Sequence, residues 1–348
     1  MNFCLNLVKY TSYCGKISWV CKELELWQFI ASRLKKNEQV MLLVVAASSG
    51  SSPGRRGYKM AVGADGKLCG SIGGGVMEVN LVEQSRALLS AAPAGAPSVT
   101  PMLIEQEHRK NSEHPSGMIC SGRQTVILRT LGPNEMETVM DLIADLQRGE
   151  EPRLVITEAE FKTAAARTEP QNCPLPCYER IDETFRYVEK LGPKNEIYII
   201  GGGHCALALS ELMSKLDFRI SIFDDRPDLN TIEKNRFAHE IRIIEGYENI
   251  GDLIPSGSNI YVVVMTLGYA SDENAIRQLA DRSFKYFGVL GSKAKMQTLI
   301  KNLRNEGFDA EKLESIHTPI GLPINSHTPE EIAVSIASEI ILIKNSTS

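Results

Sequence analysis

The chain has 348 residues, 43% of them apolar and 23% charged, which is enough to bury hydrophobic cores in two soluble domains. A net charge of -5 excludes a general attraction to nucleic acid or to an anionic membrane, and no run approaches the roughly 18 apolar residues that span a bilayer. Eight irregularly spaced cysteines argue against a disulfide framework and, with no secretory signal predicted in the first 20 residues, favour the reducing cytoplasm.

Residues 1–20 match no periodic pattern and are expected to form an extension without regular structure. Residues 21–37 place apolar side chains on one helical face, and Gln39–Ala47 is a continuous apolar strand. After a turn-rich loop over residues 48–57, Tyr58–Val62 and Lys67–Ile72 predict a hairpin.

A run of three glycines follows this hairpin. Gly73, Gly74 and Gly75 precede a helix predicted from Val76 to about Ala91, and unpaired N–H groups at a helix start attract anions. The alternative is that the glycines only make a tight turn. Arg55 and its neighbour Arg56, planar donors suited to phosphate, favour a ligand site.

The rest of this half is predicted to alternate strands with one helix, over Met102–Gln106, Thr125–Arg129, Pro133–Arg148, Arg153–Thr157 and Phe185–Val188. Cys120 stands in a small-residue loop before the second of these strands. Its default interpretation is a small buried side chain, and reactivity would require a lowered pKa. Residues 158–177 are rich in Ala, Thr and Pro and are expected to connect elements, with no metal site at Cys173 and Cys177.

A dinucleotide-binding fingerprint occupies Ile197–Asp225. A short apolar strand leads into Gly201 and Gly203, with Ala206 completing the G-x-G-x-x-A spacing. A helical stretch and a second strand then end at Asp224 and Asp225, either of which would accept hydrogen bonds from a ribose. This unit predicts a Rossmann-type fold, and a bound dinucleotide less strongly, because fold does not fix function.

Further strands alternate with helices after the fingerprint and predict a parallel sheet, with strands near Ile241–Ile244, Ile260–Met265 and Tyr286–Leu290. Gly291, Ser292 and Lys293 form a strand-to-helix turn that lacks the first glycine of a Walker A motif. Such a turn lies at the carboxyl edge of the sheet, where these folds bind ligands.

The final helix begins with a predicted capping box, in which Thr328 is the N-cap, Pro329 follows at N1 and Glu331 stands at N3. The helix is strongly apolar, so it either packs on the sheet or takes part in a dimer, and we prefer a homodimer. The sequence thus predicts an α/β protein. A mixed-sheet α/β domain over residues 21–192 follows the extension, and a Rossmann-type domain with a doubly wound parallel sheet and the C-terminal helix covers residues 193–348.

The chain resembles the XdhC/CoxI family, the accessory factors of xanthine dehydrogenase and related molybdenum hydroxylases. The resemblance covers nearly everything after residue 21 and rests on GSSPGRRGYKMAV, DGKLCGSIGGGVMEVN, MICSGRQTVIL, IYIIGGGHCALALS, FDDRPD, GVLGSKAKM and HTPIGLPINSHTPEEIAVSIASEI. It implies a non-catalytic factor that binds molybdenum cofactor, as molybdopterin or its dinucleotide form. With a cysteine desulfurase, such a factor delivers the sulfurated cofactor to the apo-hydroxylase.

The resemblance also implies site residues. Cofactor-binding positions carried over from the family are Pro53, Arg55, Gly57, Lys59, Gly73, Gly74, Gly75, Glu78, Gly201, Gly203, His204, Asp224, Asp225, Arg226, Gly291, Ser292 and Lys293. Cys120 is the candidate for contact with sulfur or metal, and no protein-held metal is implied. Two motifs depart from the family. A loop that usually reads T-R-G-H has Leu267 and Tyr269 in place of the basic residue and the imidazole, and C-G-G is Cys120-Ser121-Gly122.

Two other functions remain open. An NAD(P)-dependent oxidoreductase would use the Rossmann unit with His204 or Tyr269 as acid or base, although no Tyr-x-x-x-Lys relay follows the fingerprint. A pure scaffold would leave the glycine turns empty and act through protein contacts alone. An NAD dehydrogenase has no reason to carry the family-specific segments, so the maturation factor is preferred, the oxidoreductase comes second and the scaffold third, with no nucleic-acid or membrane partner expected.

Overall fold

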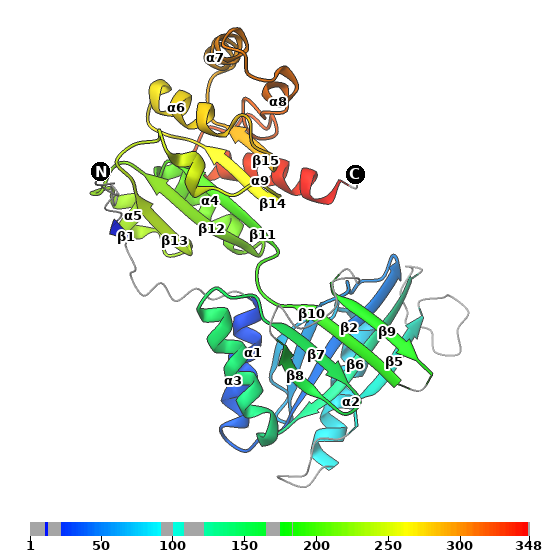
Figure 1. The fold of residues 1–348 in the computed structure, drawn as a ribbon. Helices are drawn as coiled ribbons and strands as arrows, with labels where there is room; N and C mark the ends of the chain where they lie inside the picture. The colour runs from blue at the N-terminus through cyan, green and yellow to red at the C-terminus, as the bar shows by residue number, and fades with distance from the viewer. Residues whose placement is uncertain are drawn as a thin grey trace, which may run out of the picture. The chain divides into compact units, whose positions relative to one another are not determined.

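The computed structural model describes residues 11–12, 22–91, 100–107, 122–164, 175–182 and 184–346. The chain divides into two compact units (Figure 1). Val20–Gly192 form the N-terminal unit. Pro193–Ser348, together with Met1–Trp19, form the C-terminal unit.

Two antiparallel sheets build the N-terminal unit. The five-stranded sheet has the order β4-β3-β2-β6-β5, with β2 Val40–Gly50, β3 Lys59–Gly63, β4 Leu68–Gly70, β5 Met102–Glu107 and β6 Gly122–Leu131. The four-stranded sheet has the order β8-β7-β10-β9, with β7 Arg153–Thr157, β8 Phe161–Ala164, β9 Cys177–Ile181 and β10 Thr184–Lys190.

Every described pair of neighbouring strands in this unit is antiparallel, whereas the sequence suggested a mixed sheet. Short connections join β2 to β3, β3 to β4, β7 to β8 and β9 to β10. Antiparallel neighbours accept such short turns, while a parallel pair needs a crossover of a dozen or more residues. The segment 158–177, which the sequence predicted to be a connection, contains β8 and the first residue of β9.

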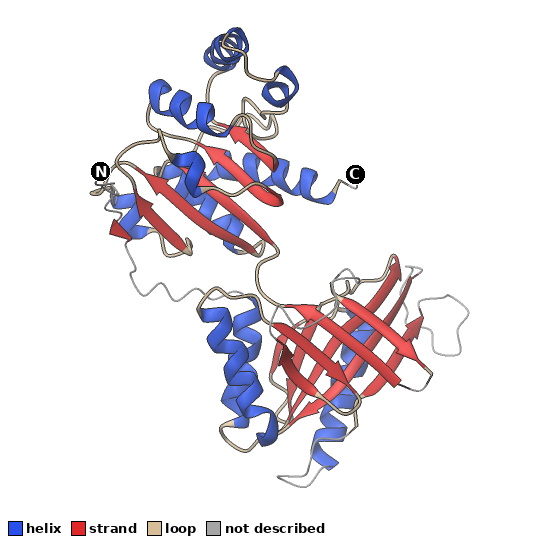
Figure 2. Cartoon of the chain, viewed as in Figure 1, coloured by secondary structure: helices blue, strands red, loops and turns tan. Residues whose placement is uncertain are grey.

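Among the described residues of this unit, the helices are α1 Lys22–Leu34, α2 Gly75–Ala91 and α3 Met136–Gln147, the last preceded by the 3-10 turn Pro133–Glu135 (Figure 2). The predicted face of α1 is buried, with Trp27 and Ile30 fully inaccessible. Trp27 packs against Phe161 of β8 with ring centroids 6.2 Å apart. The helix α2 packs on the five-stranded sheet and contributes Leu81, Val82 and Leu89 to the hydrophobic core that they share.

The C-terminal unit has the predicted doubly wound sheet. Its strands run in the order β1-β13-β12-β11-β14-β15, with β1 Thr11–Ser12, β11 Asn195–Ile200, β12 Phe218–Asp224, β13 Glu240–Ile243, β14 Gly257–Val264 and β15 Phe284–Val289. Strands β11 to β15 are mutually parallel, and β1 pairs antiparallel with β13. The order reverses between β11 and β14, which is the switch point where ligands bind in such sheets.

Helices cover both faces of this sheet (Figure 1). The helices are α4 His204–Ser214, α5 Asn230–Lys234, α6 Tyr269–Leu279, α7 Lys293–Asn305, α8 Ala310–Glu314 and α9 Pro329–Asn345, with a 3-10 turn at Ile250–Leu253. One core contains α4 and α9 residues such as Leu209 and Ile336, and the other contains α6 and α7 residues such as Ile276 and Leu299. The capping box of α9 is confirmed, because Thr328 Oγ1 accepts from the Glu331 N–H at 3.2 Å.

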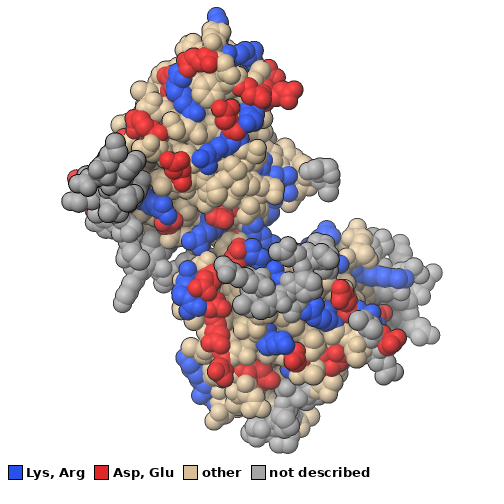
Figure 3. All heavy atoms as spheres, viewed as in Figure 1, with Lys and Arg blue, Asp and Glu red and all other residues tan. Residues whose placement is uncertain are grey.

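The surface carries no extended region of one charge sign on the face drawn in Figure 3, where acidic and basic side chains are interspersed over the described part of each unit. Within the described ranges, the helices are all too short or too polar to cross a bilayer.

Candidate functional site

The glycine turn after β11 brings two loops of the sheet edge together. Gly201 has a φ of 106°, and a Cβ on it would lie 2.3 Å from the carbonyl oxygen of Met265, the residue after β14. Only glycine fits there without displacing backbone. Gly203 differs, because no described protein atom outside its own neighbours lies within 4 Å of a Cβ built on it.

The helix α4 starts at this turn without help from a side chain. Its N-cap Gly203 is extended and no described side chain caps it. The same holds for α6, with N-cap Gly268, and for α7, with N-cap Ser292. All three helices follow parallel strands, so their N-termini lie at one edge of the sheet, and uncapped N–H groups there attract anions.

The carboxylate of Asp224, at the end of β12, is hydrogen-bonded within the protein. Its carboxylate is fully buried and accepts hydrogen bonds from the Gly202 N–H at 2.6 Å and from the Arg226 N–H at 2.8 Å. The Arg226 guanidinium adds two more, from Nε at 2.8 Å and Nη2 at 2.7 Å. Burial alone would raise the pKa of Asp224, but these donors hold it below its ordinary value. Asp224 therefore fixes the glycine turn and has no lone pair left for a ligand.

Asp225 is the acidic residue that faces solvent. Its side chain is 37% exposed, accepts from the Tyr247 hydroxyl at 3.2 Å, and stands 3.8 Å from Arg226 Nε. Of the two carboxylates that the sequence left open for a ribose, only that of Asp225 is accessible.

The loop after β14 has Leu267 and Tyr269 where the family pattern has Arg and His. Thr266 is held by Asp272, which accepts from its N–H at 3.1 Å and from its hydroxyl at 2.6 Å. Leu267 is 82% exposed and Tyr269 is also exposed. His204 and Lys293, the first residues of α4 and α7, are exposed at the same edge.

In the N-terminal unit, Glu78 closes the start of α2 from within. Its Oε2 accepts from the Ile72 N–H at 2.8 Å, the Gly74 N–H at 2.9 Å and the Ser71 hydroxyl at 2.7 Å. The anion position that the glycine run predicted thus holds a carboxylate of the protein. Gly73, with a φ of 125°, is needed because its Cβ would lie 2.4 Å from the Gly54 nitrogen.

Lys59 is buried in an ionic cluster. Its ammonium lies 2.8 Å from Glu189 and 3.2 Å from Glu23, and it donates to the Gly57 carbonyl at 3.0 Å. Burial alone would lower the pKa of Lys59, but the two carboxylates raise it overall. Burial, together with the Glu189 charge, raises the pKa of Glu23 against the attraction of Lys59. Three acceptors satisfy the three ammonium protons, so Lys59 supports the Arg55–Gly57 loop rather than facing outward.

The other predicted residues of this loop differ in exposure. Arg55 is exposed and its Nη1 donates to the Gly50 carbonyl at 3.4 Å. Gly57 has a φ of 90°, and a Cβ there would meet the Glu189 carboxylate at 2.7 Å. Pro53 is partly buried beside the Gly73 turn. That these residues bind a cofactor stays a prediction.

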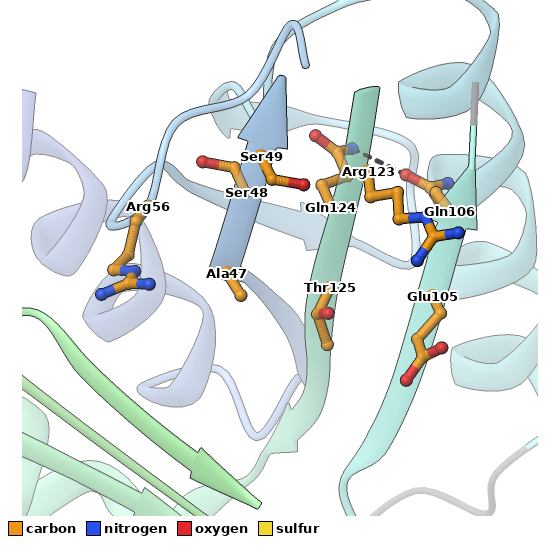
Figure 4. A pocket seen from close by; sticks show the side chains of 9 residues that line it. All are labelled: Ala47, Ser48, Ser49, Arg56, Glu105, Gln106, Arg123, Gln124 and Thr125. Carbon is orange, nitrogen blue, oxygen red and sulfur yellow. Dashed lines mark hydrogen bonds between the residues drawn. The ribbon is translucent and has the colours of Figure 1, made fainter. Parts of the chain in front are cut away.

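Sequence reasoning missed a hollow of about 690 Å³ at the ends of β2, β5 and β6. It is lined by Ala47, Ser48, Ser49, Arg56, Glu105, Gln106, Arg123, Gln124 and Thr125 (Figure 4). These residues come from three distant stretches of sequence, and none belongs to the predicted site. The sequence feature that pointed toward this hollow was Arg56, the second residue of the Arg55-Arg56 pair.

The two cysteine predictions, for Cys120 and for Cys173 with Cys177, have different outcomes. Cys120 lies outside the described residues, two positions before β6 begins. Cys177 is disulfide-bonded, a bond that the sequence did not predict, and Cys69 and Cys205 are free. The described residues contain no group of three or more His, Cys, Asp or Glu side chains arranged to hold a metal.

Comparisons with known proteins cover both units. The XdhC Rossmann domain family matches residues 197–340, and the XdhC and CoxI family matches residues 33–97. A Bacillus subtilis protein described as a probable component of xanthine dehydrogenase is 22% identical over 88% of this chain and 94% of its own length. The uncharacterized protein YqeB of Escherichia coli is 23% identical over 86% of this chain, which spans 43% of its length.

A solved structure has the same fold. A crystal structure described as that of a xanthine dehydrogenase from Bacillus halodurans superposes with a TM-score of 0.68 at 23% identity, over 94% of this chain and 96% of that one.

Proposed function

The chain belongs to the XdhC and CoxI family, and from this premise we propose that it is an accessory factor of a xanthine dehydrogenase-type molybdenum hydroxylase. The description of the Bacillus subtilis relative as a probable xanthine dehydrogenase component supports that client. In finer terms, the chain binds molybdenum cofactor, as molybdopterin or its dinucleotide, and assists its sulfuration and insertion. A cysteine desulfurase and the apo-hydroxylase are its partners in the cytoplasm.

The observation that carries this proposal is the carboxyl edge of the C-terminal sheet. The N-termini of α4, α6 and α7 have no cap from a described side chain there, and the space beside Gly203 and Gly268 is open. Oriented N–H groups and close backbone approach are what a phosphate requires. The helices α3 and α5 also start without a side-chain cap, so the position of α4, α6 and α7 at the carboxyl edge, and not the missing cap alone, supports the proposal.

The residues fit the organic part of the cofactor rather than its metal. Phosphate groups match the helix starts, and the exposed Asp225 matches a ribose of the dinucleotide form. The described residues supply no metal-ligating cluster. When bound, the cofactor supplies the dithiolene-held molybdenum that the client needs, and this chain binds and orients its phosphates.

The same edge favours one alternative, an oxidoreductase that binds NAD(P), since an exposed acid at the tip of β12 also suits a nicotinamide dinucleotide. It has less support, because no Tyr-x-x-x-Lys relay accompanies its two acid or base candidates, His204 and Tyr269.

The test is the ligand content of the protein purified without oxygen, measured by mass spectrometry. We expect molybdopterin or its dinucleotide at about one equivalent per chain, and its loss in Gly203→Val, which fills the open space at α4. Deletion of the gene should leave the hydroxylase present but inactive. Normal hydroxylase activity in the deletion strain would falsify the accessory role, and stoichiometric NAD(P) instead of the pterin would favour the oxidoreductase.

A further inference from the structure

Asp272 lies in the first turn of α6, at the carboxyl edge of the C-terminal sheet. Its Oδ1 accepts from the Thr266 N–H at 3.1 Å and lies 2.6 Å from the Thr266 hydroxyl. The same hydroxyl lies 3.2 Å from the carbonyl oxygen of Gly268, which is the N-cap of α6. The Thr266 hydroxyl therefore connects the Asp272 carboxyl to the N-cap, so this carboxyl lies beside a helix start that attracts anions.

Both protonation states of Asp272 find hydrogen-bond partners in this arrangement. When the carboxyl is ionised, it accepts the proton of the Thr266 hydroxyl at 2.6 Å. When the carboxyl is protonated, it donates to Thr266 Oγ1, and the Thr266 hydroxyl turns to donate to the Gly268 carbonyl at 3.2 Å. Asp272 can thus gain or lose a proton without leaving its own hydroxyl or that of Thr266 unpaired.

The surroundings of Asp272 favour its neutral form more than water does. Burial raises the pKa of the Asp272 carboxyl, and the Thr266 donors and the Lys295 ammonium on α7 lower it by less. Strand β14 contributes apolar side chains to the core under α6, among them Val262 and Val264. Other charged side chains of α6 and of the elements packed on it are paired elsewhere: Asp252 with Arg282, Glu273 and Glu306 with Arg277, and Arg304 with Glu314.

We propose that anion binding at this edge is coupled to the uptake of one proton by Asp272. A phosphate at the start of α6 places negative charge beside the carboxyl, and a nearby like charge favours the neutral form of an acid. The proton comes from solvent and removes a charge that opposes the ligand. The ligand is therefore bound more tightly at lower pH and is released as the pH rises. The inference rests on the proposed function in that the function places a phosphate at this edge.

The experiment titrates ADP-ribose into the full chain by calorimetry between about pH 8 and 5.5. ADP-ribose is the probe because both of its phosphates stay ionised over this range, so that the pH dependence belongs to the protein. Repeating the titration at about pH 6.5 in PIPES and in imidazole, which differ in ionisation enthalpy, measures the protons taken up on binding.

Four variants separate Asp272 from the other groups of the edge. Asp272→Asn removes the charge at nearly constant shape, and Thr266→Val removes the connecting hydroxyl. His204→Gln removes another titratable side chain at this edge. Asp252→Asn is the matched control, because the Asp252 side chain is 84% exposed on the 3-10 turn that packs against α6. Thermal melts verify that every variant is folded.

We expect the native chain to bind ADP-ribose about threefold to tenfold more tightly at the lower pH, since a rise of one pKa unit on binding corresponds to at most about tenfold in affinity. Asp272→Asn should bind as tightly at the higher pH as at the lower and lose most of the proton uptake. Thr266→Val should move the pH dependence upward, because the ionised carboxyl loses a donor. Asp252→Asn and His204→Gln should both keep the proton uptake by Asp272.

Two results would overturn the inference while leaving the proposed function intact. One is a native affinity for ADP-ribose that does not change with pH, and the other is the same pH dependence in Asp272→Asn as in the native chain. Failure of ADP-ribose to bind at any pH also overturns it, and the pterin content of the protein purified without oxygen then decides the function alone. If that protein holds no pterin but ADP-ribose binds with proton uptake by Asp272, the inference stands and the cofactor function fails.

Discussion

Gly201 has a φ of 106° and its Cβ would lie 2.3 Å from Met265 O, whereas the space around Gly203, with a φ of -72°, is open. We therefore expect Gly201→Ala to lower the free energy of unfolding of the C-terminal unit by about 3 kcal/mol, from backbone strain and a steric clash. Gly203→Ala should change it by less than about 0.5 kcal/mol and weaken cofactor retention, because its methyl group occupies the space left for phosphate.

Urea unfolding followed by far-UV circular dichroism measures the first effect, and cofactor content by mass spectrometry measures the second. Equal stability losses in the two variants would show that both glycines serve the fold and would remove the phosphate interpretation of Gly203.

Variants of Asp224 and Asp225 should likewise distinguish an effect on stability from an effect on ligand binding. Asp224→Asn replaces acceptors of the Gly202 and Arg226 N–H groups by an amide that satisfies fewer of them, so we expect a loss of about 2 kcal/mol in unfolding free energy. Asp225→Asn should leave stability within about 0.5 kcal/mol and weaken a nucleotide that offers a ribose diol, about tenfold.

ADP-ribose is the probe for this pair, titrated by calorimetry into the full chain. Unchanged ADP-ribose affinity in Asp225→Asn would mean that the tip of β12 does not bind a ribose.

At the scale of elements, His239 links the start of β13 to β12. Its Nδ1 accepts from the Ile220 N–H at 2.9 Å, and burial, with a contribution from Arg219, lowers its pKa to about 3. The unfolded chain takes up a proton near the ordinary pKa of about 6.5, and the folded chain does not. Stability from this group is therefore present above about pH 6.5 and is lost as the pH falls toward 3, at up to roughly 1.4 kcal/mol per pH unit.

His239→Asn keeps an acceptor for Ile220 and removes the titration, so the C-terminal unit should lose less stability between about pH 7 and 4.5. Chemical unfolding at several pH values measures the slope, with His327→Gln at an exposed position as the control. The same slope in His239→Asn as in the native chain would contradict this account.

Helices and strands that have a clear pattern of apolar or capping residues were predictable from the sequence. The strand Arg153–Thr157 and the capped helix after Thr328 agree with the sequence, because apolar runs and capping side chains act locally. Strand β8 was missed, since Phe161–Ala164 carries one large apolar residue and its pairing partner β7 supplies the rest. Strand β1 was missed for the same reason, because two residues, Thr11 and Ser12, have no pattern of their own.

We propose that the chain forms a homodimer through α9, as the sequence suggested. Val334, Ile341 and Leu342 are exposed, and their spacing puts them on one face of the helix. Val334→Lys and Leu342→Lys should each weaken the dimer about tenfold or more and leave the far-UV circular dichroism spectrum unchanged. Sedimentation velocity measures the mass, and Lys301→Glu on α7 is the control. A native chain that sediments as a monomer ends this proposal.

The site was less predictable than the fold because residue type does not distinguish a ligand contact from an internal one. Glu78 and Lys59 carry the chemistry of ligand contacts, and the structure gives both of them partners within the protein. The hollow was missed for a different reason. Its lining residues Ala47, Glu105 and Thr125 lie on three paired strands, and no local pattern in the sequence predicts the register between strands so far apart in the chain.

The buried ammonium of Lys59 has a practical consequence. Its side chain is 4% exposed and enclosed by Glu23, Glu189 and a carbonyl, while the side chain of Lys67 in the same unit is 75% exposed. An amine-reactive reagent should thus modify Lys67 at once and reach Lys59 only when α1 separates from the sheet. The labelling rate of one lysine, read by peptide mass spectrometry, then times the opening of the N-terminal unit without any added reporter.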